Sequence, residues 1–120
     1  MLGIDTNVLI RFLVRDDEAQ YEKARKLIRR EVMAGRQVFV SQLVLLETEW
    51  VLRSRYALQT AEIVGVFSGL LDATDVQFED ESSIEDALFV WKDHSAGFAD
   101  CLIAAQNRRL GGVPIPQPLT

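Results

Sequence analysis

The stretch Leu2-Gly3-Ile4-Asp5-Thr6-Asn7-Val8-Leu9-Ile10 decides the fold of this chain. Its first three residues are typical of the end of a short buried strand, and the apolar spacing that follows predicts a helix beginning at Thr6. Asp5 therefore stands where the strand stops. In open α/β sheets, ligands bind beyond the carboxyl ends of the strands, where a carboxylate can hold a hard metal ion. Asp, Thr and Asn also cap helices, so the tripeptide alone fits a cap as well as a site.

Length and composition indicate a single domain with its own core. The chain has 120 residues, 48% of them hydrophobic, and a formal net charge of −5. It therefore has no general basic field for nucleic acid, and any contact with RNA or DNA needs a local patch or bound cations. Cys101 is the only cysteine, which excludes an internal disulfide and suits a reducing compartment. With no evident signal peptide and no apolar stretch of about 20 residues, we expect a cytoplasmic protein without membrane contact.

Short apolar segments alternate with longer amphipathic ones along the chain. Strands are predicted at 2–4, 38–40 and 76–78. Helices are predicted at 6–14, 18–34, 42–56, 60–71, from 82 or 83 to 93, and at 98–110. Strands separated by helices indicate an α/β fold with a parallel sheet covered on both faces. Residues 113–120 contain all three prolines, which predicts an extended or disordered tail and no central strand.

Glu47 lies in an apolar segment of the third predicted helix. The residues three and four positions away from it are all apolar: Leu43, Val44, Trp50 and Val51. Glu47 is therefore predicted to point into the interior or into a cleft. Glu49 has Arg53 four residues further on and is predicted at the surface. Because a lone buried carboxylate is costly, Glu47 is expected either to pair with an arginine or to bind a metal ion.

Asp100 lies in the first turn of the last predicted helix, within an otherwise apolar run. An acid there interacts favourably with the helix dipole, and the same dipole would keep the carboxylate ionised beside other carboxylates. One turn after Asp100, Ala104 is small and leaves room along the same face of the helix, and Asn107, a further turn on, keeps that face polar. Three acids beside apolar sequence are explained most simply if Asp5, Glu47 and Asp100 converge.

Converging carboxylates need a cation, because like charges raise one another's pKa. Oxygen ligands suit Mg²⁺ or Mn²⁺, whereas a lone His94 and a lone Cys101 do not make a zinc site. A hard cation held by few carboxylates keeps waters, binds phosphate and can activate water for phosphodiester cleavage. It would also bring the positive charge that the surface lacks.

Two other acidic chemistries fit the chain less well. An aspartyl phosphohydrolase needs an acid where Asn7 stands. A response regulator needs its acidic pair at the first strand, whereas Asp16 and Asp17 fall in a later turn. Four arginines are candidates for phosphate contact, although solvation of the surface explains them equally well: Arg11, Arg15, Arg53 and Arg55.

The chain resembles the PIN domain and, more narrowly, the VapC-type toxins of bacterial toxin–antitoxin pairs. Three segments carry the resemblance in the family's order and separation, namely residues 3–9 (GIDTNVL), 45–52 (LLETEWVL) and 97–105 (GFADCLIAA). The resemblance covers the chain up to Gly112 and implies a three-layer α/β/α domain over residues 1–112 with a short parallel sheet. It also implies a Mg²⁺- or Mn²⁺-dependent endoribonuclease that cleaves RNA phosphodiester bonds.

The resemblance further implies the residues of the site and the partners. Asp5, Glu47 and Asp100 would bind the metal ion and position the attacking water. Three more residues would line the site: Thr6, Asn7 and Ser41. A VapB-type antitoxin would inhibit the enzyme, and the toxin would form a homodimer.

The chain departs from the family pattern after Gly112. Family members usually continue into a final strand and a fourth acidic residue near the metal, whereas residues 113–120 contain no acid. The C-terminal strand is therefore expected to be missing or altered, which would weaken the metal site and leave a sheet edge unpaired. This departure motivates an alternative function, a catalytically impaired PIN domain that acts as an antitoxin-binding module.

Overall fold

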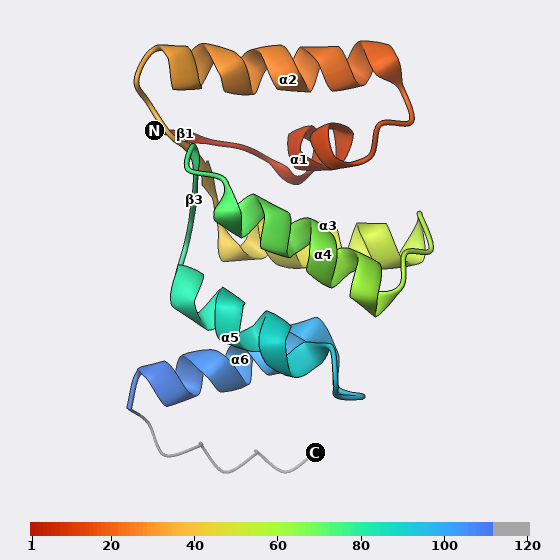
Figure 1. The fold of residues 1–120 in the computed structure, drawn as a ribbon, viewed down its shortest axis with the longest axis vertical. Helices are drawn as coiled ribbons and strands as arrows, with labels where there is room; N and C mark the ends of the chain where they lie inside the picture. The colour runs from red at the N-terminus through yellow and green to blue at the C-terminus, as the bar shows by residue number, and fades with distance from the viewer. Residues whose placement is uncertain (112–120) are drawn as a thin grey trace. The chain divides into compact units, whose positions relative to one another are not determined.

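The computed structural model describes residues 1–111, which divide between Glu79 and Asp80 into two compact units (Figure 1). The first unit contains β1 (Leu2–Gly3), α1 (Thr6–Leu13), α2 (Glu18–Met33), β2 (Val38–Val40), α3 (Gln42–Ser54), α4 (Thr60–Asp72) and β3 (Val76–Phe78). The second unit contains α5 (Glu81–Trp91) and α6 (Phe98–Arg109). No helix among these residues is long and apolar enough to cross a membrane.

The three strands form a parallel sheet in the order β1-β2-β3. Leu2 pairs with Val38, which pairs in turn with Val76. Because the strands run parallel, their carboxyl ends lie at the same edge of the sheet, where Asp5 and Ser41 follow β1 and β2. The α/β class with a short parallel sheet is confirmed, and the predicted strands and helices differ from the observed ones by at most two residues at each end.

Three helices of the first unit, α1, α2 and α3, begin at short polar side chains that accept a free backbone N–H. Asp5 accepts from the Val8 N–H at 2.9 Å, and Asp17 accepts from the Gln20 N–H at 3.1 Å. Gly35 follows α2 with a φ of +78°, a left-handed conformation that ends the helix at little cost. α1 packs against both α2 and α3, while α2 contacts β2 and α4 contacts β3 (Figure 1).

The core of the first unit is formed by side chains that are almost inaccessible to solvent: Leu9, Val38, Val40, Leu45, Leu52, Ile63 and Phe67. Leu9 lies one turn after Asp5, and Leu45 lies at the start of α3. The core therefore fixes the beginnings of the two helices that carry the candidate site.

The second unit is a pair of packed helices. The apolar side chains at helical spacing on α5 are buried: Ile84, Ala87, Leu88 and Trp91. Trp91 lies against Phe98 of α6, with 5.2 Å between ring centroids. The sequence predicts that this helix begins at 82 or 83, whereas α5 begins at Glu81, directly after Asp80, and Ser83 is buried within it. The proline-rich residues 113–120, the site of the expected missing strand, lie outside the described residues.

Candidate active site

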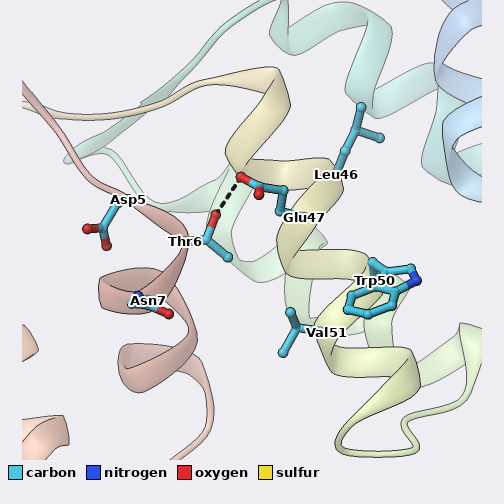
Figure 2. A pocket seen from close by; sticks show the side chains of 7 residues that line it. All are labelled: Asp5, Thr6, Asn7, Leu46, Glu47, Trp50 and Val51. Carbon is cyan, nitrogen blue, oxygen red and sulfur yellow. Dashed lines mark hydrogen bonds between the residues drawn. The ribbon is translucent and has the colours of Figure 1, made fainter.

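A cavity of about 600 Å³ lies where the start of α1 faces α3 (Figure 2). Seven residues line it: Asp5, Thr6, Asn7, Leu46, Glu47, Trp50 and Val51. Three come from the tripeptide after β1 and four from the middle of α3. Two segments about forty residues apart in the chain therefore build one site.

Asp5 serves both as a helix cap and as a cavity residue. Its Oδ1 accepts the Val8 N–H, which fixes the carboxylate at the start of α1. Its Oδ2 makes no hydrogen bond to the described part of the chain, and the residue is exposed. The two readings of the tripeptide are thus compatible, because one oxygen satisfies the helix and the other remains available.

Glu47 is held by a residue of the opposite helix. Its Oε1 accepts the hydroxyl of Thr6 at 3.0 Å, a contact between residues 41 positions apart (Figure 2). Thr6 is the first residue of α1, directly after Asp5. The hydrogen bond therefore turns the Glu47 carboxylate toward the part of the cavity that the tripeptide lines.

The prediction for the two acids of α3 was wrong about which one is buried. Glu49 is 5% exposed, whereas Glu47 is exposed and lies in the cavity. The apolar neighbours of Glu47 mark no interior face, because Leu43 is 67% and Trp50 60% exposed. Of the two options for Glu47, interior or cleft, the structure shows the cleft. Glu49 does pair with Arg53, at 2.7 Å.

Ser41 is not among the residues that line the cavity. Ser41 caps α3, where its Oγ accepts the Val44 N–H at 3.2 Å. Asp100 belongs to the second unit, where it is exposed in the first turn of α6 as the sequence predicts. Glu79, an acid that follows β3 and was not singled out in the sequence, accepts the Gln42 N–H at 2.9 Å and so also caps α3.

The donor set of the cavity suits a hard cation. It offers two carboxylates with available oxygens, and its seven lining residues include no Lys, Arg or His to neutralise them. Within the first unit, residues 1–79, no group of three or more Asp, Glu, His or Cys side chains is close enough to hold a metal ion. Mg²⁺ is commonly held by one or two carboxylates and completes its shell with water and substrate phosphates. Asp5 and Glu47 fit that kind of site.

The sequence missed the apolar half of the cavity. Leu46, Trp50 and Val51 line it together with the acids (Figure 2). Two of these residues lie three and four positions after Glu47, so the helical spacing did mark them as its neighbours. The spacing could not show that this face of α3 borders a cavity.

The cavity combines two carboxylates with apolar side chains, beyond the carboxyl edge of a parallel sheet. A sequence model of the PIN domain matches residues 3–113, so the chain belongs to the PIN-domain family, a family of nucleases. Among solved structures it is similar to Mycobacterium tuberculosis VapC20, a toxin described as cleaving the sarcin-ricin loop. That similarity has 24% sequence identity and a TM-score of 0.47 over 93% of this chain and 85% of VapC20. No curated protein matches the chain.

Proposed function

We propose that this protein is a VapC-type endoribonuclease that cleaves RNA phosphodiester bonds with Mg²⁺ or Mn²⁺. The observation that carries the proposal is that Asp5 and Glu47 line the same cavity, whose lining includes no basic residue. Membership of a nuclease family supports the reaction class. A divalent cation bound there would polarise a water and stabilise the leaving oxygen, and it would offset the repulsion between an acidic site and RNA.

The chain's own residues have distinct roles in this proposal. Asp5 and Glu47 are the metal ligands that the first unit supplies, and Thr6 orients Glu47 through its hydroxyl. Asn7 offers an amide that can donate to a phosphate oxygen or to a base. The exposed indole of Trp50 gives the cavity an aromatic surface on which an unpaired base can stack. Asp100 is assigned as a further metal ligand by the family motif alone, and that role stays a prediction.

The remaining parts of the proposal come from the VapC-type resemblance. They are a VapB-type antitoxin that inhibits the enzyme, a homodimer and a cytoplasmic location. Co-purification with the product of an adjacent small gene, followed by measurement of the mass of the complex, would test the partner and the oligomeric state together.

The decisive experiment is cleavage of a mixed cellular RNA pool by the purified chain with Mn²⁺. Asp5→Asn isolates the metal role, because Asn caps a helix about as well as Asp and leaves α1 intact. We expect Asp5→Asn and Glu47→Gln to lower the cleavage rate at least tenfold, as loss of a metal ligand does. Glu85→Gln, which removes an exposed acid of α5, is the matched control and should cleave normally. A folded Asp5→Asn chain that cuts at the normal rate would refute the assignment.

A second function remains in contention, an antitoxin-binding module that does not cut. The lack of any acid in residues 113–120, where family members usually carry a fourth one, motivates it. Its signature would be a folded chain that binds its antitoxin tightly, yet shows no metal-dependent cleavage of RNA.

A further inference from the structure

A second cavity, of about 190 Å³, lies between α1 and α2. Six residues line it: Val8, Arg11, Gln20, Lys23, Ala24 and Leu27. Its polar groups are a guanidinium, an ammonium and an amide, and none of its lining residues is acidic. This composition is the reverse of the first cavity, and it is unusual in a chain whose net charge is −5.

Neither cation of this cavity forms an ion pair within residues 1–111, whereas two nearby arginines do. Arg15 pairs with Glu18 at 2.8 Å, and Arg25 pairs with Glu22 at 3.0 Å. Arg11 and Lys23, by contrast, make no ion pair within residues 1–111. The acids nearest along α2 are thus already neutralised, and the positive charge of the cavity remains available for a ligand.

The position of the cavity relates it to the active site. Asn7 lines the first cavity and Arg11 the second, and residues four apart on a helix share a face. Their backbone positions differ by about 6 Å along the axis of α1, from a rise of 1.5 Å per residue. A chain of phosphates that enters the first cavity can therefore continue along α1 into the second.

We propose that the cavity lined by Arg11, Gln20 and Lys23 binds a backbone phosphate of the RNA strand, beside the phosphate held at the active site. Arg offers a planar set of donors that matches phosphate oxygens, and Lys adds a compact charge. The contact reads no base and would position the strand for cleavage. This inference rests on the proposed function, because it takes RNA as the substrate of the neighbouring cavity.

The test measures binding of a short fluorescein-labelled single-stranded RNA by fluorescence anisotropy, in EDTA and over a series of salt concentrations. The variant is Arg11→Gln with Lys23→Gln. The matched control is Arg29→Gln with Arg30→Gln, which removes the same charge from exposed positions of α2 outside the cavity. Thermal melting checks that both chains are folded.

We expect the cavity variant to bind RNA more weakly and with a shallower salt dependence. For single strands, each lost phosphate contact lowers the slope of log K against log salt by about 0.7. The control pair should change the slope less. The proposal is wrong if the cavity variant and the control variant lower the RNA affinity and its salt slope equally, or if the cavity variant changes neither.

The outcomes also separate this inference from the proposed function. RNA binding that depends on Arg11 and Lys23, in a chain that never cleaves RNA, would refute the nuclease assignment and keep the phosphate site. Cleavage that depends on Asp5, with KM unchanged in the cavity variant, would keep the nuclease and refute the phosphate site.

Discussion

Replacement of Thr6 by Val removes the hydroxyl that holds Glu47 while keeping the shape of the side chain. A hydrogen bond to a charged group is worth about 1.5–3 kcal/mol when buried. Here Glu47 is exposed and Thr6 only half-buried, so we take about 1 kcal/mol for the 3.0 Å bond. Since 1.4 kcal/mol corresponds to a factor of ten, Mn²⁺ binding should weaken roughly fivefold. The free energy of unfolding should fall by no more than about the same 1 kcal/mol, because the bond is present without a metal ion and Val and Thr have similar helix propensities.

The assay is a calorimetric titration of the purified chain with Mn²⁺, beside Thr6→Ser as the matched control. Ser keeps the hydroxyl and should retain most of the affinity. If Thr6→Val binds Mn²⁺ as tightly as the unmodified chain, the Thr6–Glu47 contact does not orient a ligand. If Thr6→Ser loses as much affinity as Thr6→Val, the methyl group matters and the hydroxyl does not.

Two further predictions concern stability. Glu49→Gln should lower the free energy of unfolding by about 1 kcal/mol, because it leaves Arg53 without its partner at 2.7 Å. RNA cleavage by this variant should survive. Loss of cleavage at unchanged stability would contradict the prediction. Ser83 first, then Gln106 and Arg109, hold the pKa of Asp80 below its usual value. Its charge therefore stabilises the folded state above pH about 4, and that contribution is lost as the pH falls through the lowered pKa. In urea unfolding followed by tryptophan fluorescence, the free energy of unfolding of Asp80→Asn should thus be lower than that of the unmodified chain at pH 7, and the difference should be smaller at pH 3. A difference that stays constant with pH would refute the role of the Asp80 charge.

Local features of the site were readable from the sequence, because their causes are local. Asp5 follows an apolar strand and precedes a helical pattern, and it does cap α1. Asp100 does lie in the first turn of α6. In each case the deciding groups are within four residues, so the printed sequence contains the whole interaction.

The orientation of α3 was not readable in the same way. Glu47 and Glu49 both have apolar residues at helical spacing, and only what packs against each face distinguishes them. The side with Glu49 meets the core formed by Leu45 and Leu52, whereas the side with Glu47 and Trp50 opens to the cavity. Spacing along a helix identifies which residues share a face, and the fold decides which face is buried.

The sequence by itself determined the strands, the helices, the Asp5 cap of α1 and the acids that could serve a metal site, since these follow from periodicity and short-range hydrogen bonds. Only the tertiary structure decided that Thr6 reaches Glu47, and that cations without an ion pair in residues 1–111 line a cavity beside α1. The physical reason is the parallel pairing of β1 with β2. It sets the segments after these two strands side by side, although 41 residues separate the two side chains that meet.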